Sequence, residues 1–453
     1  MNPLPNGEAP GLFTDLYELT MAAGYFQNGF DARATFELFV RRLPRERHYL
    51  VAAGLEQALE FLENLSFSPE AIAFLREQPV FGHVRQEFFD YLAKLRFTGE
   101  VWAVPEGTIV FPEEPLLRIT APIIEGQLVE TRVLSSINFQ TMIASRAARI
   151  VTAAAGRDVV EFGARRAHGS EAGILAARAA WIAGCAGTSN MVAAKRYGIP
   201  AYGTQAHSWI MAFESESQAF ARFMDIFPEH ATLLLDTYDT RAALEKIIAS
   251  GQKPAGVRLD SGNMAADSRW VRRALDRVGW NDVQIFASGD LNEQKIATLL
   301  RRGAKIDAFG VGSSIVAPTD TPNLSTIYKL VEVERGGKTR EAAKFSEAKA
   351  TYPGRKQVFR FADARGKWKH DEIALANEAP RNGAPLLVPV MREGKRIAPA
   401  ESLEKARARC AESLKQLPPR LLSLRPAQPY PVRHSKPLRA LMQQVRRRIR
   451  TQR

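Results

Sequence analysis

The stretch Gly256-Val257-Arg258-Leu259-Asp260 decides how the middle of this 453-residue chain is interpreted. A short apolar run ends there in a charged residue, and a helical pattern follows. The same unit recurs between about residues 158 and 314. Its other runs are Val159-Val160-Glu161-Phe162-Gly163, Ala201-Tyr202-Gly203-Thr204, Leu233-Leu234-Leu235-Asp236, Val283-Gln284-Ile285-Phe286-Ala287 and Ala308-Phe309-Gly310-Val311-Gly312. Apolar runs that alternate with helices predict parallel strands covered by helices.

This repeat predicts an α/β fold, in which residues 128–330 form an irregular β/α barrel. Six units are fewer than the eight of a regular TIM barrel, so an open Rossmann-like sheet is the structural alternative. The flanks differ in character: residues 1–127 combine helices with short strands, and residues 331–453 return to strands and end in a basic helical tail. We expect these two flanks to pack together as a second, split α+β domain.

Composition narrows the class of protein. Apolar residues make up 45% and charged residues 25% of the chain, which is typical of a soluble globular protein. The sequence has no run of about 18 apolar residues, so no transmembrane helix is expected, and its first residues lack a secretory signal pattern. The two cysteines, Cys185 and Cys410, are too few for a disulfide framework or a four-cysteine zinc site. We expect a cytoplasmic protein with two free thiols.

The net charge of +13 is concentrated near the C-terminus. From Glu401 to Arg453 there are 14 Lys and Arg against 3 Asp and Glu, so the first 400 residues are close to neutral. Such a tail could attract nucleic acid or a membrane surface. No aromatic residues interleave with the terminal arginines to stack on bases, and this favours a solvated helix end over a nucleic-acid site.

Polar residues and glycine turns follow the predicted strands, at the edge where ligands bind in barrels and open α/β sheets. They are His207, Asp236, Arg258, Asp260 and Asp290, with the turns Ala287-Ser288-Gly289-Asp290 and Gly310-Val311-Gly312-Ser313-Ser314. Glycines in such turns let backbone N–H groups approach a phosphate closely. The set suits a phosphorylated, hydroxylated substrate, although a tight structural turn is the alternative for either glycine segment.

Arg258 and Asp260 should point to the same face of their strand, because side chains alternate with a period of two. The guanidinium can grip a carboxylate or a phosphate, and the carboxylate can bind a ribose diol or Mg²⁺. Together with Asp236 on a nearby strand, Asp260 could share a Mg²⁺–diphosphate substrate. A structural ion pair is the alternative for Arg258 and Asp260. His207 could attack a phosphoryl group, or it could be a packed or capping histidine.

Two common kinds of site are missing from the sequence. No His-Glu-x-x-His or Cys-x-x-Cys spacing occurs, so a zinc ion held by the protein is not expected. The chain also lacks a Gly-x-x-x-x-Gly-Lys-Ser/Thr loop, so ATP would need another kind of site.

A series of motifs in a fixed order gives the chain a close resemblance to the nicotinate phosphoribosyltransferases. The motifs are Thr14-Asp15-Leu16-Tyr17, Glu161-Phe162-Gly163-Ala164-Arg165-Arg166, Gly187-Thr188-Ser189-Asn190, Gly203-Thr204-Gln205-Ala206-His207-Ser208, Asp236-Thr237-Tyr238, Val257-Arg258-Leu259-Asp260-Ser261-Gly262, Ala287-Ser288-Gly289-Asp290, Phe309-Gly310-Val311-Gly312, Lys344-Phe345-Ser346-Glu347 and Pro353-Gly354-Arg355-Lys356. They run from residue 14 to about residue 360, and the segment around Tyr430 is similar to the family's C-terminal region. Each motif is moderately specific, and their shared order is highly specific.

The resemblance implies a type II phosphoribosyltransferase fold with residues 128–330 as its catalytic domain. It also implies an ATP-coupled ligase reaction. Nicotinate would react with 5-phosphoribosyl 1-diphosphate to give nicotinate mononucleotide and diphosphate, the first step of NAD synthesis from nicotinate. ATP hydrolysis would be coupled to this transfer through a phosphohistidine, and Mg²⁺ would be required.

By motif matching, the resemblance gives His207 the role of the phosphorylated histidine. Asp236 and Asp260 would complete the catalytic set and hold Mg²⁺, indirectly or through the substrate diphosphate. The residues that would hold the phosphoribosyl diphosphate are Arg165, Asp236, Asp260, Gly289, Asp290, Gly312 and Ser313.

Five residues would recognise the pyridine ring. The resemblance implies that Arg258 and Thr204 contact nicotinate. Phe162 would form one face of an aromatic sandwich, and Tyr17 of a neighbouring subunit would form the other, which implies a homodimer with a shared site. At the position of Ser189, related enzymes that use nicotinamide have an aspartate, which would repel the carboxylate of nicotinate. We therefore expect nicotinate to be preferred over nicotinamide.

Departures from the family pattern and three alternatives remain. Ser313 stands where threonine is common, a change that keeps the hydroxyl. Asn263 replaces the aspartate that usually follows Arg-Leu-Asp-Ser-Gly, and this change affects the expected efficiency more than the expected activity. A quinolinate or a nicotinamide phosphoribosyltransferase is the enzymatic alternative, although Arg166 is the only obvious spare arginine for the second carboxylate of quinolinate. A non-catalytic nucleotide-binding homologue with a basic tail would be expected to have lost His207, Asp236 or Arg258.

Overall fold

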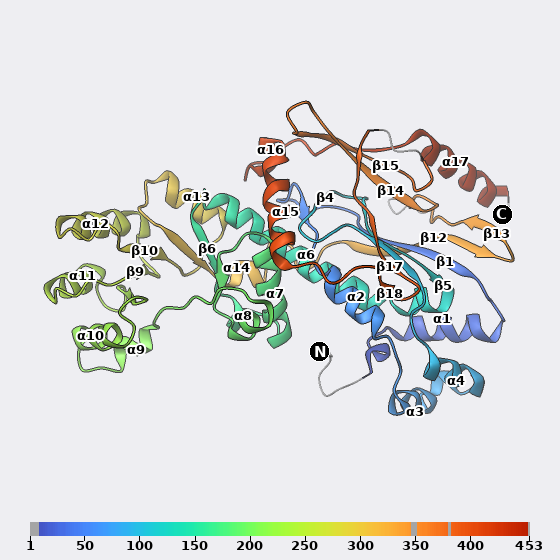
Figure 1. The fold of residues 1–453 in the computed structure, drawn as a ribbon, viewed down its shortest axis with the longest axis horizontal. Helices are drawn as coiled ribbons and strands as arrows, with labels where there is room; N and C mark the ends of the chain where they lie inside the picture. The colour runs from blue at the N-terminus through green and yellow to red at the C-terminus, as the bar shows by residue number, and fades with distance from the viewer. Residues whose placement is uncertain (1–8, 346–350, 379–381, 452–453) are drawn as a thin grey trace. The chain divides into compact units, whose positions relative to one another are not determined.

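The computed structural model describes residues 9–345, 351–378 and 382–451 of the chain (Figure 1). Two compact units make up the protein. The first combines both ends of the chain, Met1–Met142 and Asn323–Arg453, and the second is Ile143–Pro322. The boundary between them falls within a long helix, α6 (Glu130–Ala153). Each unit has its own sheets, so each is described by itself.

A six-stranded parallel sheet forms the second unit, in the order β7-β6-β11-β10-β9-β8. Its strands are β6 (Asp158–Glu161), β7 (Gly187–Thr188), β8 (Thr232–Leu234), β9 (Gly256–Leu259), β10 (Gln284–Ala287) and β11 (Ala308–Val311). The pairings between these strands are all parallel. The predicted α/β class and its parallel strands are therefore confirmed. Among the described residues, the pairings join the strands in one line that runs from β7 to β8.

Helices follow the strands of this unit. They are η4 (Ala164–Arg166), α7 (Ser170–Ile182), α8 (Met191–Tyr197), α9 (His207–Met211), α10 (Glu216–Ile226), α11 (Thr240–Ala249), α12 (Met264–Arg277), α13 (Glu293–Arg301) and α14 (Ser313–Val316). Ser215 caps α10 with its side chain. Side-chain caps also start four helices that directly follow a strand: Asn190 for α8, Asp239 for α11, Asn263 for α12 and Asn292 for α13. Each of these four caps fixes the residue at which its helix begins. Only a short loop separates that helix from the strand before it.

The core of the second unit lies between the strands and the helices that follow them. Leu233, Val257 and Ile285 from three adjacent strands pack in one buried cluster with Leu244 of α11 and Val271 of α12. Burying these apolar side chains on the faces of the sheet leaves the polar residues of the loops at its carboxyl edge.

One predicted strand is wrong. The run Ala201–Thr204 contributes only an isolated bridge, between Ala201 and Thr188. The edge strand is instead β7, which comes earlier in the chain. Pro200 cannot donate a ladder hydrogen bond, and residues 201–203 are exposed, so this run lacks the buried face that a strand in a parallel sheet needs. The bridge still brings Gly203 and Thr204 to the edge of the sheet.

Strands from both ends of the chain alternate in the first unit. Its seven-stranded sheet has the order β13-β12-β1-β5-β3-β17-β18. The strands are β1 (Arg33–Val40), β3 (Glu100–Ala103), β5 (Pro115–Pro122), β12 (Thr326–Arg335), β13 (Lys338–Glu341), β17 (Val388–Arg392) and β18 (Lys395–Arg396). N-terminal β1 lies between β5 and C-terminal β12, and β3 pairs with C-terminal β17, in each case antiparallel. The two flanks of the chain therefore share one sheet.

Smaller sheets and helices complete the first unit. A four-stranded sheet has the order β16 (Ala384–Pro385), β14 (Lys356–Ala362), β15 (Trp368–Leu375) and β19 (Val432–His434), and β2 (Leu50–Val51) pairs with β4 (Ile109–Val110). The helices are η2 (Pro10–Leu12), α1 (Leu16–Gln27), α2 (Leu55–Glu63), α3 (Pro69–Glu77), η3 (Pro79–Phe81), α4 (Gln86–Lys94), α5 (Ile123–Leu128), α15 (Leu403–Gln416), α16 (Pro419–Leu422) and α17 (Lys436–Thr451). In the described part of the chain, every helix is too short or too polar to traverse a bilayer.

The basic tail forms α17, which packs against its own unit. Leu438 and Val445 are buried. Arg448 lies 3.4 Å from the carboxylate of Glu341, and the guanidinium of Arg446 lies 5.5 Å from the ring centre of Phe345. Part of the positive charge of the tail is therefore used in contacts within the protein.

Candidate active site

Arg258 lies at the centre of a hydrogen-bonded cluster at the carboxyl edge of the parallel sheet. Its Nε donates to Ser288 Oγ (2.6 Å), just beyond the neighbouring strand β10. Its Nη1 donates to Thr204 Oγ1 (2.7 Å) and to the carbonyl of Gln205 (3.1 Å). Its Nη2 donates to Asp260 Oδ1 (2.5 Å). Only 12% of the Arg258 side chain is exposed, so partners from three segments fix the plane of the guanidinium.

Asp260 lies between this guanidinium and an imidazole. Its Oδ1 also accepts a hydrogen bond from Ser288, and its Oδ2 is 3.8 Å from Nε2 of His207. Burial alone would raise the pKa of the Asp260 carboxyl, but the hydrogen bond from Ser288 and the positive charge of Arg258 hold it below its usual value. Asp260 therefore presents a full negative charge at neutral pH.

His207 is anchored on one side and open on the other. Its Nδ1 lies 3.1 Å from Oγ1 of Thr237, while Nε2 faces Asp260. The side chain is 42% exposed, so a substrate can reach it. The predicted proximity of His207 to Arg258 and Asp260 is present in the structure. An imidazole held at one nitrogen and accessible at the other can act as a nucleophile or as a proton acceptor.

Asp236 supports the turn that carries Asp260. Its Oδ2 accepts hydrogen bonds from the backbone N–H of Asp260 (3.2 Å) and from the hydroxyl of Ser261. Its Oδ1 is buried and, within the described residues, has no hydrogen-bond partner. A buried acceptor without a partner is costly, so this oxygen fits a position that a cation or a donor on the substrate completes.

The oxygen-rich edge fits Mg²⁺ better than a softer metal, because Mg²⁺ prefers carboxylate, phosphate and water oxygens. Across the described ranges, no three His, Cys, Asp or Glu side chains lie close enough together to bind a metal ion without other ligands. A magnesium ion at Asp236 and Asp260 would therefore need oxygens from substrate and water as well.

Two glycines allow close approach of the loops at this edge. Gly289 has φ of 96°, and a Cβ placed there would lie 2.3 Å from the carbonyl oxygen of Asp260. In Gly312, a Cβ would lie 3.0 Å from the carbonyl oxygen of Phe162. Asp290 and Ser313 follow these glycines directly and are exposed. The glycines thus bring the loops after β10 and β11 close to those after β9 and β6.

Phe162 is half-buried at the end of β6 and tilts against Phe286, with 5.5 Å between the ring centres. Gly310 leaves room for it, because a Cβ there would lie 2.7 Å from the Phe162 ring. Arg165, in η4, and Ser189, directly after β7, are exposed. In the described structure, no hydrogen bond joins Arg165 or Ser189 to the Arg258 cluster. They lie beyond neighbouring strands of the same sheet.

Tyr17 belongs to α1 in the first unit, where its side chain is 46% exposed. Burial of part of the ring and the negative charge of Glu130 raise the pKa of its hydroxyl. The predicted role of Tyr17 in a neighbouring subunit stays a prediction.

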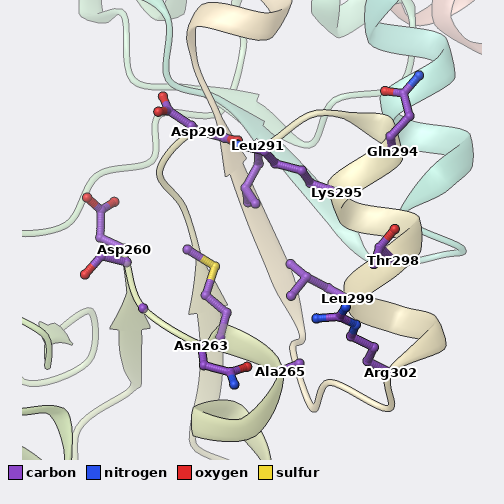
Figure 2. Close-up of a pocket in the computed structure, with 13 residues that line it drawn as sticks. Asp260, Asn263, Ala265, Asp290, Leu291, Gln294, Lys295, Thr298, Leu299 and Arg302 are labelled. Carbon is purple, nitrogen blue, oxygen red and sulfur yellow. The ribbon is translucent and has the colours of Figure 1, made fainter.

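A cavity of about 890 Å³ opens beside Asp260 and Asp290 (Figure 2). One wall is the turn from Asp260 to Ala265. The other is the face of α13 that carries Gln294, Lys295, Thr298 and Leu299, with Arg302 directly after the helix. Asn263 lines it and caps α12, with its Oδ1 accepting from the N–H of Ala266 at 3.3 Å. Asparagine and aspartate cap helices about equally well, so the departure from the family pattern keeps the cap and removes a charge.

Sequence reasoning gave no role to three residues that shape the site. Ser288 bridges Arg258 and Asp260, and Thr237 anchors His207. Glu161 is buried at the end of β6, where its carboxylate accepts hydrogen bonds from Thr188 Oγ1 (2.6 Å) and the N–H of Gly163. Burial raises its pKa, and these two hydrogen bonds oppose the shift. All three residues stand inside the strand-end motifs, which is the signal that could have found them.

Sequence profiles of one enzyme family cover most of the chain. The nicotinate phosphoribosyltransferase N-terminal domain matches residues 12–138, the family's main profile matches residues 158–373, and its C-terminal domain matches residues 380–442. The chain belongs to the nicotinate phosphoribosyltransferase family. The resemblance predicted from the ordered motifs is confirmed, and the members of this family are enzymes.

Individual nicotinate phosphoribosyltransferases are similar over most of their length. The pncB2 protein of Mycobacterium tuberculosis is 47% identical over 420 residues, which cover 91% of this chain and 89% of the relative. The Bacillus subtilis enzyme is 41% identical over 378 residues, covering 81% of this chain and 76% of the relative.

Solved structures of this group share the fold. Human nicotinic acid phosphoribosyltransferase superposes with a TM-score of 0.83 at 28% identity, covering 95% of this chain and 99% of the human one. A nicotinate-nucleotide pyrophosphorylase from Pyrococcus furiosus gives a TM-score of 0.72 at 28% identity, covering 90% and 95% of the two chains.

Proposed function

We propose that this chain transfers a phosphoribosyl group from 5-phosphoribosyl 1-diphosphate to nicotinate, giving nicotinate mononucleotide and diphosphate, with ATP hydrolysis coupled to the transfer. The observation that carries the proposal is the cluster of Arg258, Asp260 and His207 beside two glycine loops, in a chain of this family. Nicotinate mononucleotide made in this way would enter NAD synthesis, which fits a cytoplasmic enzyme. Family membership also supports an irregular β/α barrel for residues 128–330.

The pyridine acid would bind at the Arg258 end of the cluster. The Nη1 group of Arg258 and the hydroxyl of Thr204 already lie 2.7 Å apart, so both can reach one carboxylate oxygen with charge-assisted hydrogen bonds. The half-buried ring of Phe162 offers a flat apolar surface at the same edge of the sheet. Ser189, one strand further along, is neutral and can donate a hydrogen bond, which favours a carboxylate over a carboxamide.

The phosphoribosyl diphosphate would occupy the loops that follow β6, β9, β10 and β11. Backbone N–H groups near Gly289 and Gly312 would hold phosphate oxygens, with Ser313, Asp290 and Arg165 beside them. Asp236 and Asp260 would lie near the ribose and hold Mg²⁺ through the diphosphate. When bound, this ion would neutralise negative charge on the leaving diphosphate.

Asp260 has the charge that the transfer requires. Displacement at the anomeric carbon breaks the C–O bond to diphosphate and forms the bond to the pyridine nitrogen, so positive charge develops on the ribose between these events. The lowered pKa of Asp260 keeps its carboxylate ionised, and a fixed negative charge close to the ribose stabilises that transition state. Arg258 and Ser288 hold the carboxylate in place.

His207 would carry the phosphoryl group from ATP. Its Nε2 would attack the γ-phosphorus, an N–P bond would form, and ADP would leave with the bonding electron pair. Water would later cleave the N–P bond and release phosphate. Because Nε2 faces the Asp260 carboxylate at 3.8 Å, a phosphoryl group there would add negative charge next to a fixed negative charge. The resulting repulsion would rearrange the cluster and couple ATP hydrolysis to the substrate site.

One assay tests the reaction. Formation of nicotinate mononucleotide is measured with and without ATP, and nicotinamide and quinolinate serve as competing substrates. We expect turnover of nicotinate, stimulation by ATP and at least tenfold preference over the other two, because a site with a mismatched polar group rejects a ligand by about that factor or more. Equal turnover of nicotinamide, or exclusive use of quinolinate, would contradict the proposal.

A labelling experiment tests His207. We expect γ-labelled ATP to give an acid-labile, base-stable label on the wild-type protein and none on His207→Ala. His230→Ala is the control, because His230 is an exposed histidine of the same unit that lies outside the cluster. A His207→Ala protein that still takes the label and keeps its stimulation by ATP would refute this role.

Tyr17 suggests that two subunits share a site, and we propose a homodimer in which Tyr17 of one copy covers the pyridine ring bound by the other. Mixing two inactive variants, Tyr17→Ala and His207→Ala, tests it. If sites are shared, mixed dimers contain one site with both native residues and activity returns. Activity that stays absent in verified mixed dimers would argue that each site is complete within one chain.

A further inference from the structure

A buried ion pair joins the two glycine loops at the carboxyl edge of the sheet. We propose that Arg146 and Glu293 are positioning residues that hold the loops after β10 and β11 in the arrangement that binds phosphoribosyl diphosphate. The inference rests on the proposed function, and it adds residues that touch no substrate. All the residues involved belong to the second compact unit.

Arg146 directly contacts α14, the short helix that begins after β11 and Gly312. It stands on α6 with its side chain 4% exposed. Its Nε donates to the backbone carbonyl of Ser314 (3.2 Å), and its Nη2 donates to the hydroxyl of the same residue (3.1 Å). Ser314 directly follows Gly312 and Ser313. Two bonds from one planar group to one residue fix both the position and the orientation of the start of α14, and so of the Gly312 turn before it.

Glu293 connects the same arginine to the loop after β10. Its side chain is fully buried, and its Oε1 accepts from Nη1 of Arg146 at 2.5 Å. A second arginine on α6, Arg149, lies 3.4 Å from the same oxygen. Glu293 is the first residue of α13, directly after the cap Asn292 and three residues beyond Asp290. Any shift of Glu293 therefore moves the start of α13 and the preceding loop, which contains Asp290.

The hydrogen bond to Ser314 also affects chemistry at the edge. Arginine can only donate, so the Ser314 hydroxyl accepts from Nη2, and its own hydrogen remains available for another acceptor. A hydroxyl that accepts from a cation is a stronger donor, because hydrogen bonds in a chain polarise one another. A phosphate oxygen near Gly312 and Ser313 would be a suitable acceptor.

A purely structural role is the competing explanation. Buried ion pairs often add little net stability, because removing two charges from water costs about as much as their attraction returns. The contacts with Ser314 distinguish the two explanations. A pair that served only stability need not contact Ser314, whereas Arg146 donates to both the carbonyl and the hydroxyl of this α14 residue, next to the proposed phosphate site.

The central test is the substitution Arg146→Lys. Lysine keeps a positive charge for Glu293 but lacks the planar fork that bonds Ser314 twice. We expect the KM for phosphoribosyl diphosphate to rise roughly tenfold or more, since small misplacement of a binding group has effects of that size. The KM for nicotinate should change less than about twofold, because Arg146 contacts neither Arg258 nor Thr204.

Two further variants keep the test usable if Arg146→Lys folds poorly. Ser314→Ala removes only the hydroxyl. Glu293→Gln keeps the shape of the side chain but removes the nearer of two carboxylate charges beside Arg146, the other being Asp320 at 3.8 Å. Both should raise the KM for phosphoribosyl diphosphate selectively, with a smaller effect for Ser314→Ala because the carbonyl bond remains.

Arg272→Lys is the matched control. Arg272 also bonds a carboxylate, Asp276 (2.8 Å), and two backbone carbonyls, those of Val283 (2.8 Å) and Trp280 (2.6 Å). These contacts lie at the amino end of β10, which is the opposite edge of the sheet. Arg272→Lys should lower the midpoint temperature of unfolding without a selective change in the KM for phosphoribosyl diphosphate or for nicotinate.

The outcomes are distinguishable. If the wild-type protein shows no phosphoribosyl transfer, the proposed function itself is refuted. If the wild type is active, the variants at Arg146, Glu293 and Ser314 decide. This inference alone is overturned if they change the KM for phosphoribosyl diphosphate and the KM for nicotinate equally, or change neither. Selective changes in Arg272→Lys would overturn it as well.

Discussion

We expect the Ser288 hydroxyl to have a large effect on the charge of Asp260. Its side chain is almost completely buried, and its hydroxyl donates to Asp260 while it accepts from Arg258. The hydrogen bond from Ser288 is the largest of the interactions that lower the pKa of Asp260 against the effect of burial. At the residue scale, the proposed chemistry therefore depends on groups that set the protonation of a single carboxyl.

We predict that Ser288→Ala raises the pKa of Asp260. Because its pKa is lowered, Asp260 in the wild type stays ionised until the pH falls below the ordinary range of an aspartate. The stabilising contribution of the Asp260 carboxylate is lost only as the pH falls through the pKa of the folded state. In the variant, the acid limb of kcat/KM against pH should move to higher pH. Ser268→Ala is the control, because Ser268 is a buried serine of the same unit that bonds Ala265 and Lys305 instead. An unmoved acid limb in Ser288→Ala would contradict this account.

Gly289 gives a second prediction for a single residue. Alanine there would combine an unfavourable positive φ with a Cβ 2.3 Å from the carbonyl of Asp260. We expect Gly289→Ala to lower the free energy of unfolding by about 2–4 kcal/mol, measured by denaturant titration. Gly279→Ala separates the two causes, because Gly279 also has a positive φ, 77°, but has open space where the Cβ would lie. Equal losses in the two variants would show that the close approach to Asp260 is unimportant.

Helix starts are the elements that place the loops of the site. Asn263 caps α12 directly after the turn from Asp260, and Asn292 caps α13 directly after the turn from Asp290. Each cap satisfies a backbone N–H of the first turn and so fixes the residue at which the loop ends. The cavity of Figure 2 lies between the turn that leads into α12 and one face of α13, so both caps help to place its walls.

The cap at Asn263 makes a testable prediction. Asn263→Asp should leave the free energy of unfolding within about 0.5 kcal/mol of wild type, because both residues cap equally well, whereas Asn263→Ala should lose about 1 kcal/mol. Asn292→Ala is the matched comparison and should lose a similar amount. Differential scanning calorimetry can resolve these differences. A stable Asn263→Ala protein alongside a destabilised Asn292→Ala protein would mean that α12 does not depend on its cap.

At the scale of the whole molecule, the chain folds into two units with separate cores. Leu438 of α17 is fully buried in the unit formed by both ends of the chain, and Leu244 of α11 is fully buried in the unit with the parallel sheet. Because the first unit needs both flanks, contacts that stabilise it join residues hundreds of positions apart, such as Arg33 and Glu334 in neighbouring strands.

We predict that a large-to-small substitution in the core of one unit destabilises mainly that unit. Leu438→Ala and Leu244→Ala should each destabilise by about 2–5 kcal/mol, as large-to-small changes in packed cores do. Hydrogen exchange followed by mass spectrometry should show lost protection mainly in residues 9–142 and 323–451 for Leu438→Ala, and mainly in residues 143–322 for Leu244→Ala. Uniform loss across both units in either variant would instead indicate one cooperative fold.

The sequence by itself determined the α/β alternation, the family and the residues at the strand ends. These features are local: apolar runs, glycine turns and capping residues act on neighbours in the chain, so their pattern can be recognised without a structure. The run at Ala201–Thr204 shows the limit of that pattern, because its composition suits a strand but its exposure does not.

Only the tertiary structure decided which polar groups meet. His207 and Asp260, Arg258 and Ser288, and Arg146 and Ser314 are far apart in sequence, and the last two pairs are separated by 30 and 168 positions. Any buried polar group needs a hydrogen-bond partner, and many residues of the chain could serve as one. The packing of strands and helices decides which of them lies close enough. Which strands of the two flanks pair with each other depends in the same way on long-range contacts, which local patterns do not encode.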